Sequence, residues 1–147
     1  MESEDSNLVR NWMRSKTTVS SEATIMEVAE VMASEDVGSV LVTLSGVEKG
    51  ILTERDLTRK VLAKGLDPKT TLAKDVMSTP LLTIPQDATL WEAAETMSKK
   101  RIRRLPVVDE SGRVRGVIST RIISYALPFM KTAKSRMLQL LRTDKDE

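Results

Sequence analysis

Residues 50–56, Gly-Ile-Leu-Thr-Glu-Arg-Asp, combine a glycine, a hydroxyl and a carboxylate where a strand is expected to give way to a helix. Gly50 lets another group approach the backbone closely, and the Thr53 hydroxyl and the amides after it can face a phosphate. Asp56 can accept hydrogen bonds from both hydroxyls of a ribose. The same Thr and Asp, three residues apart, also fit an ordinary helix N-cap. Spacing alone favours capping.

The chain has no His and no Cys, which removes the usual general base at neutral pH, thiol nucleophiles and most zinc sites. No G-x-S-x-G, G-x-x-x-x-G-K-[ST] or G-x-G-x-x-G sequence occurs, and residues 64–70 have the wrong spacing for a phosphate loop. We therefore expect a protein that is not an enzyme and holds no metal. An adenylate-hydrolysing enzyme is a weaker alternative, because no positioned base is visible.

The composition predicts a globular protein: of 147 residues, 40% are apolar and 30% are charged, with a formal net charge of +2. Uncharged runs such as 37–45 are far shorter than the roughly 18 apolar residues of a membrane helix. The acidic start also lacks the basic and apolar regions of a signal peptide. We expect a soluble, cytoplasmic protein without a membrane partner. Residues 99–104 and 131–142 are locally basic.

Two copies of one sequence unit cover roughly residues 11–124. The register carries Met32 onto Met97 and Val42 onto Val107. The aligned stretches are 11–13 with 75–77, 18–29 with 83–94, and 50–55 with 116–121. Each copy is predicted to run strand, helix, strand, strand, helix.

The helices and hairpins of the two copies have recognisable starts and ends. Thr24-x-x-Glu27 and Thr89-x-x-Glu92 are capping boxes, and each is followed by apolar residues at helical spacing. The β-branched runs, each pair split by a glycine-bearing turn, are 39–43 with 47–52 and 105–108 with 114–118. Residues 54–63 predict a further helix that ends near Gly65; its counterpart begins at about Thr120 and bends at Pro128.

The order of elements predicts an α+β fold. One copy buries too little apolar surface to be stable alone, so the repeats at 8–65 and 75–127 are expected to pack sheet to sheet as one pseudo-twofold module. Residues 66–74 form the predicted linker, and residues 128–147 form a predicted C-terminal amphipathic helix and tail.

The sequence resembles the CBS (cystathionine-beta-synthase) domain family, whose paired repeats form a Bateman module. The resemblance rests on the Thr-x-x-Glu helix start, the Arg-Leu-Pro-Val-Val-Asp stretch at 104–109, and an apolar-Gly-x-x-[ST]-x-x-[DN] element that ends each hairpin. Each element is weak alone, but together and repeated they are specific. The resemblance implies a regulatory module that senses adenine nucleotides (AMP, ADP or ATP), without a covalent cofactor. It also implies a homodimer that acts on an unidentified protein.

In the family, the Thr and Asp of one repeat bind the ligand and the opposite repeat completes the site. Carried over residue by residue, the implied ligand-binding residues are Thr53, Arg55, Asp56, Thr83, Ile84, Arg103, Arg104 and Arg121. Arginine forks match phosphate oxygens, so three of them favour a phosphorylated ligand over S-adenosylmethionine. The alternative is a solvated basic face, partly paired with Asp109 or Glu110. Family sites usually hold adenine, and the residues leave guanine open.

The second repeat departs from this pattern, because Ile122 occupies the position of the ribose-binding Asp. Isoleucine accepts no hydrogen bond, and ribose hydroxyls left without partners cost about 1–3 kcal/mol. In the first repeat, Gly38 and Ser39 replace the cationic pair. A second site at Thr18, Gly38, Ser39 and Ser119 is therefore predicted to be weak or vacant.

The stretch 128–142 has an apolar stripe among basic residues, formed by Met130, Ala133, Met137, Leu140 and Leu141. Such a stripe most often makes a core or dimer contact. A basic amphipathic helix also fits an acidic partner, RNA or a membrane surface. This supports a rival function, a ribosome- or RNA-associated scaffold with the same fold, since backbone binding needs only charge. Against it, the chain's few aromatic residues form no stacking platform.

Overall fold

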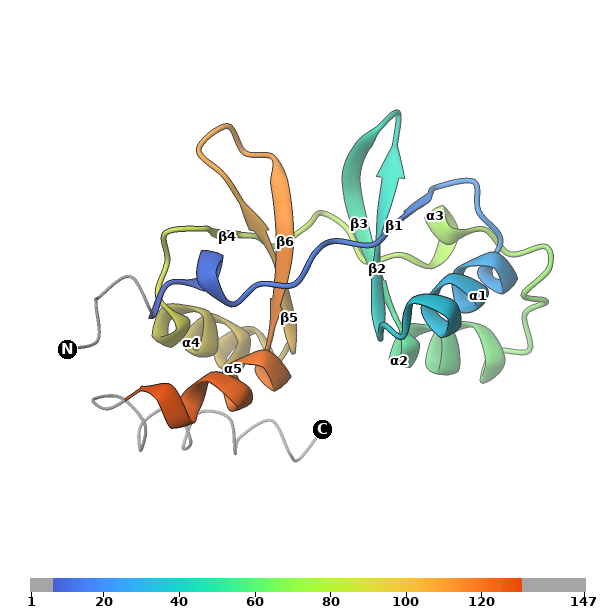
Figure 1. Cartoon of the computed structure of the whole chain (residues 1–147). Helices are drawn as coiled ribbons and strands as arrows, with labels where there is room; N and C mark the ends of the chain where they lie inside the picture. The colour runs from blue at the N-terminus through green and yellow to red at the C-terminus, as the bar shows by residue number, and fades with distance from the viewer. Residues whose placement is uncertain (1–6, 131–147) are drawn as a thin grey trace. The chain divides into compact units, whose positions relative to one another are not determined.

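A computed structural model describes residues 7–130, which fold as two compact units. The contiguous unit comprises Lys16–Leu81. The composite unit combines the described residues up to Ser15 with those from Leu82 onward. Each unit has a three-stranded sheet and a hydrophobic core of its own (Figure 1). The α+β fold class predicted from the sequence is confirmed.

The contiguous unit follows the predicted order of strand, helix, strand, strand, helix. Its sheet has the order β1-β2-β3, with β1 parallel and β3 antiparallel to β2. Its elements are β1 (Thr18–Ser20), α1 (Ile25–Glu35), β2 (Ser39–Leu44), β3 (Val47–Thr53), α2 (Glu54–Asp56), a π-helical turn (Leu57–Leu62) and α3 (Ala73–Val76). Helices α1 and α2 lie on the same side of the sheet (Figure 1).

The composite unit repeats this topology with sheet order β4-β5-β6. Its elements are a 3-10 turn (Val9–Asn11), β4 (Ile84–Pro85), α4 (Leu90–Lys100), β5 (Arg104–Val108), β6 (Val114–Ser119), α5 (Thr120–Ala126) and a second 3-10 turn (Leu127–Phe129). The last helix does not bend at Pro128 as expected. It ends at Ala126, and Pro128 lies in the first turn of the 3-10 segment, where its missing amide costs nothing.

Local sequence signals account for the starts and ends of the helices. The Thr24 hydroxyl accepts from the Glu27 amide at 3.1 Å, and the Thr89 hydroxyl accepts from the Glu92 amide at 3.0 Å. Both predicted capping boxes are complete. Ser45 and Gly46 both have positive φ, 53° and 77°, as a two-residue hairpin turn requires.

The helix predicted at 54–63 is α-helical only as far as Asp56. The turn then widens, and the Ala63 amide donates to the Thr58 carbonyl at 2.9 Å, five residues back. The Thr58 hydroxyl donates to the Glu54 carbonyl at 3.2 Å, a local side-chain bond that competes with regular helix geometry. Gly65, at φ 69°, follows the end of this turn.

Two short segments each precede one repeat in the sequence but pack on the other repeat, and we call them the exchanged segments. Residues 8–14 belong to the composite unit, where the Val9 amide donates to the Ala88 carbonyl at 2.9 Å. Residues 71–79 belong to the contiguous unit, where the Ala73 amide donates to the Ala23 carbonyl at 2.7 Å. Each segment thus precedes one repeat in sequence and packs on the other. The compact units therefore divide the chain differently from the predicted repeats at 8–65 and 75–127.

The cores include these exchanged segments. Val9 is fully buried in the composite core with Leu90, Met97 and Leu105. Ala73 and Val76 are buried in the contiguous core with residues of α1, β2 and β3. In each unit the sheet and helices thus position the candidate ligand residues, and an exchanged segment completes the core.

Candidate ligand-binding site

Thr53 and Asp56 form a reciprocal capping box at the junction of β3 and α2. The Thr53 hydroxyl accepts from the Asp56 amide at 3.1 Å, and Asp56 Oδ2 accepts from the Thr53 amide at 2.9 Å. The Asp56 side chain is only 14% exposed. The capping interpretation of this pair is confirmed. The cap also fixes the carboxylate in a single orientation.

Lys60, which the sequence analysis did not single out, contacts the other oxygen of this carboxylate. Its Nζ lies 3.2 Å from Asp56 Oδ1, 3.2 Å from the Val76 carbonyl oxygen and 3.4 Å from Ser78 Oγ. The i,i+4 spacing of an acid and a lysine on one helix is a sequence signal that could have identified the first contact. The other two depend on tertiary structure.

Of the residues predicted to form the weak second site, Gly38 and Ser39 lie beside the Thr53 junction of the contiguous unit, whereas Ser119 ends β6 in the composite unit. Ser39 begins β2 and pairs with Thr53 across the sheet, and the Gly38 carbonyl accepts from the Glu54 amide at 3.0 Å. Thr18 begins β1 and pairs with Leu41. Neither Gly38 nor Ser39 carries a charge, so this end of β2 has no guanidinium of its own.

The composite unit has the same junction with different chemistry. The Ser119 hydroxyl accepts from the Ile122 amide at 3.1 Å, in the manner of Thr53. Ile122 supplies no carboxylate, so the reciprocal half of the capping box is absent here. Instead Ile122 is partly buried against the composite core. The junction caps a helix and presents no carboxylate to a ribose.

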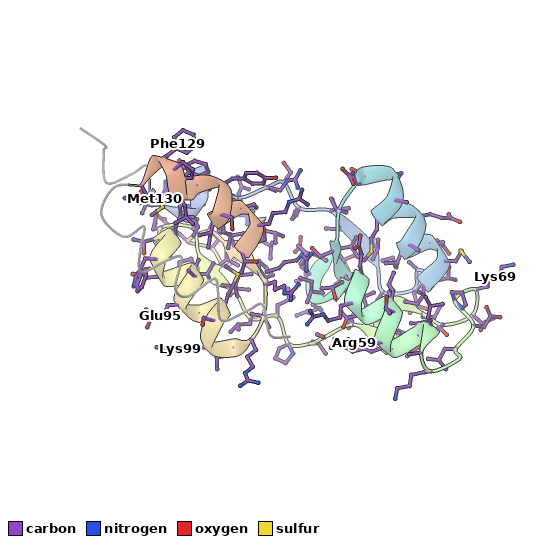
Figure 2. All side chains as sticks on the ribbon, turned by 90° about the horizontal axis from the view of Figure 1, so that it is seen from below. Arg59, Lys69, Glu95, Lys99, Phe129 and Met130 are labelled. Atoms are coloured by element: carbon purple, nitrogen blue, oxygen red, sulfur yellow. The ribbon has the colours of Figure 1, made fainter. Side chains whose placement is uncertain are left out.

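Three arginines surround this second junction. Arg104 pairs with Ser119 across the sheet, and the Arg103 carbonyl accepts from the Thr120 amide at 2.9 Å. Arg121 lies on α5 with its guanidinium carbon 6.0 Å from the centroid of the Tyr125 ring, a cation–π distance. Of the lysines before them, Lys99 pairs with Glu95 one helical turn earlier (Figure 2).

Asp109, an alternative partner for these arginines, is engaged in its own hairpin. Its Oδ1 accepts from the amides of Ser111 at 2.8 Å and Arg113 at 3.1 Å. These bonds, the one from Arg113 first, hold the pKa of Asp109 below its ordinary value. Arg115 lies 3.9 Å from the other oxygen. Asp109 thus has a structural role in the turn.

Gly50 and Gly116 serve packing in this structure. A Cβ on Gly50 would collide with the Met77 side chain, and a Cβ on Gly116 would lie 2.6 Å from the Arg14 carbonyl oxygen and 2.9 Å from Met13 Sδ. The close approach that we predicted for Gly50 therefore occurs, but the approaching group is an exchanged segment.

Thr83 and Ile84, the predicted ligand contacts at the start of β4, line an open depression of about 470 Å³ in the composite unit. Its rim includes Asp87 and Glu92, which are already engaged. Asp87 pairs with Arg10, and Glu92 accepts from the Thr89 amide at 3.1 Å. The equivalent depression in the contiguous unit has about 350 Å³ and includes Glu22, which pairs with Lys74 at 2.8 Å. These acidic rims do not favour a phosphate.

Within residues 7–130, no three acidic side chains are grouped so as to hold a metal ion, and no helix has the length and apolar character needed to cross a membrane. Most of the predicted C-terminal helix, residues 131–147, lies outside the described residues. The dimer contact and the basic partner surface predicted for that stretch remain predictions.

Comparison with known proteins places this geometry in context. The family model for the CBS domain matches residues 9–63 and 73–128. The chain is 37% identical over 118 residues to the uncharacterized protein MK0525 of Methanopyrus kandleri, a match that covers 80% of this chain and 60% of that protein. It is 39% identical over 102 residues to the CBS domain-containing protein YhcV of Bacillus subtilis, covering 69% of this chain and 71% of that one.

Among solved structures, the fold resembles the CBS domain pair of protein MJ0100 in complex with 5-methylthioadenosine and S-adenosyl-L-methionine. The two chains share 27% identity with a TM-score of 0.75, over 84% of this chain and 98% of the other. That protein binds adenosine-containing ligands on the same fold.

Proposed function

Because the chain belongs to the CBS-domain family, whose paired domains are regulatory ligand-binding modules, we propose that it senses an adenine nucleotide. The ligand is AMP, ADP or ATP, bound at one site per chain, and its occupancy regulates a separate partner protein. The adenosine-containing ligands of the MJ0100 pair support the adenosine half of this proposal.

The observation that carries the proposal is the asymmetry between two otherwise matching junctions. Both have a capping hydroxyl, Thr53 or Ser119, at the end of a hairpin. Only the first has a carboxylate three residues later, and that carboxylate is largely buried and held in one orientation. A ribose has a hydrogen-bonding partner at Asp56 and none at Ile122.

The nature of the cations favours a phosphorylated ligand. Arg103, Arg104 and Arg121 gather at the junction that lacks the acid. We propose that Thr53, Arg55 and Asp56 bind the ribose end, and that the further ligand contacts are those that the family resemblance implies: Thr83, Ile84, Arg103, Arg104 and Arg121. Guanidinium forks match phosphate oxygens better than they match the sulfonium of S-adenosylmethionine.

The proposal describes binding and regulation without catalysis. The relative YhcV is described by its CBS domains alone, and the relative MK0525 has no characterised activity. We also propose a cytoplasmic location, which the sequence pattern led us to expect, and a homodimer, which the family resemblance implies.

Isothermal titration of the full chain with AMP, ADP, ATP and S-adenosylmethionine tests the ligand. We expect a nucleotide to bind with one site per chain. Asp56→Asn retains an acceptor for the Thr53 amide and loses the charge, so it should weaken binding roughly ten- to hundredfold without removing the cap. Arg104→Ala should weaken ATP more than adenosine.

Ser119→Ala is the matched control, since it removes a helix cap of the same kind at the junction without an acid. Its affinity for nucleotide should equal that of the wild type. Equal losses in Asp56→Asn and Ser119→Ala would contradict the single-site assignment. Tight binding of S-adenosylmethionine without nucleotide binding would contradict the proposal of a phosphorylated ligand. Co-purification of RNA that is lost as the salt concentration rises, with no nucleotide binding, would favour the scaffold function.

A further inference from the structure

Lys60 bridges the candidate ribose-binding carboxylate and an exchanged segment. An ammonium has three donors, and three acceptors lie within 3.4 Å of Lys60 Nζ: Asp56 Oδ1, the Val76 carbonyl and Ser78 Oγ. The side chain of Lys60 is 45% exposed. One lysine therefore contacts both Asp56 and the chain around Val76.

The segment that Lys60 contacts runs beside β3. The Ile51 amide donates to the Ser78 carbonyl at 3.1 Å, and the Ser78 amide donates back to the Ile51 carbonyl at 2.9 Å. Thr79 Oγ1 donates to the Lys49 carbonyl at 2.8 Å, and Met77 packs on Gly50. We call residues 76–79 the docked segment. It continues along the chain to Thr83 and Ile84, at the start of the second repeat.

The composite unit shows that docking itself does not need a lysine. Arg14, the counterpart of Ser78, exchanges two hydrogen bonds of 2.9 Å with Val117, and Met13 packs on Gly116. The positions that match Asp56 and Lys60 there are Ile122 and Ala126. The acid and the lysine are present together in one repeat and absent together from the other. Lys60 thus accompanies the carboxylate and is not a general requirement of docking.

We propose that Lys60 couples occupancy of Asp56 to the stability of the docked segment, a role that rests on the proposed function. Asp56 uses one lone pair on each oxygen, for the Thr53 amide and for Lys60, and keeps others for ribose hydroxyls. A bound ribose adds hydrogen bonds that exist only while the carboxylate keeps the orientation in which it contacts Lys60, so states in which that contact has opened become rarer. Lys60 is then held in place, and so are Val76 and Ser78. Lys60 is a positioning residue in this scheme.

Measurements on the ligand-free protein test whether Lys60 holds the docked segment against β3, a role that we call the tether. Amide hydrogen exchange at Ile51 and Ser78 is compared in the wild type, Lys60→Met and Arg59→Met. Arg59, labelled in Figure 2, is the exposed neighbour on the same turn, so its replacement removes the same charge. Lys60→Met should speed exchange at both amides about three- to tenfold, and Arg59→Met should leave it unchanged. Equal exchange in the two variants would overturn the tether.

The coupling is tested with ATP at equal fractional saturation of each protein, which makes the global stabilisation by ligand the same. In the wild type and Arg59→Met, ATP should slow exchange at Ile51 and Ser78 by more than it slows the Val28 amide of α1. In Lys60→Met, ATP should slow hydrogen exchange at all three amides by the same factor. An undiminished extra slowing in Lys60→Met, or none in the wild type despite measured binding heat, would overturn the coupling. Absence of binding heat would instead remove the proposed function, and the coupling with it, while the ligand-free arm would still report on the tether.

Discussion

Asp56 can serve the helix cap and a ligand together. A carboxylate offers about four lone-pair sites, and the Thr53 amide and Lys60 use one on each oxygen. Its largely buried side chain is already ordered by these contacts, so a ribose would not have to order it. The spacing of Thr53 and Asp56 fits either a helix cap or a ribose site, and the structure shows that one carboxylate has acceptor positions for both.

Thr53 allows the two roles to be separated. Thr53→Ala and Thr24→Ala each remove a cap in the contiguous unit, and each should lower the free energy of unfolding by about 1 kcal/mol in urea titrations. Only Thr53→Ala should also weaken nucleotide binding, because Thr24 caps α1 and has no predicted ligand role. If Thr24→Ala weakened binding to the same extent, the effect of Thr53 would be one of stability alone.

Residue chemistry was largely predictable from the sequence where it depends on neighbours along the chain. The capping boxes at Thr24 and Thr89 and the substitution of Ile122 for an acid could all be identified from short spacings. Lys60 could not be assigned its partners, because Val76 and Ser78 lie 16 and 18 residues away along the chain. That contact depends on where the docked segment packs.

At the scale of elements, the exchanged segments account for both glycines that end the hairpins. Met77 occupies the space above Gly50, and the Arg14 carbonyl and Met13 occupy the space above Gly116. These contacts let an exchanged segment pair with β3 or with β6 at backbone distance. A side chain at either glycine would push the segment away from its strand.

The two glycines should differ in their tolerance of alanine. At Gly116 the nearest atom is a backbone oxygen, 2.6 Å from the new Cβ, so the segment itself must shift, and Gly116→Ala should cost about 2 kcal/mol. At Gly50 the neighbour is the flexible side chain of Met77, so Gly50→Ala should cost about 1 kcal/mol or less. Thermal and urea unfolding measure both. The reverse order would show that the Arg14 carbonyl does not limit the site.

The sequence predicted the elements well because capping, periodicity and turn residues are local. It aligned residues 11–13 with 75–77 correctly as equivalent stretches, and the structure gives them equivalent contacts. It contained no local signal for the unit on which each stretch packs. That choice is made by burial, such as that of Val9 beside Ala88, between residues far apart in sequence.

At the scale of the whole molecule, the composite unit is built from two separate stretches of chain. Val9→Ala should therefore lower the free energy of unfolding by roughly 2 kcal/mol, and it should raise amide exchange in β5 and β6 more than in β2 and β3. Val76→Ala, in the core of the contiguous unit, should show the opposite pattern. Identical profiles in the two variants would show that the units open as one body.

The exchange of segments also sets an order of events while the chain is being made. Lys16–Leu81 is contiguous, so that unit can close as soon as its own residues have emerged from the ribosome. Val9 precedes all of them in the chain, yet the other buried residues of its core cluster lie between Ile84 and Met130. Residues 8–14 can therefore be buried in the composite core only after the second repeat has been made. A chaperone or a premature contact that occupies residues 8–14 during synthesis would later hinder the folding of the second repeat, because those residues complete its core.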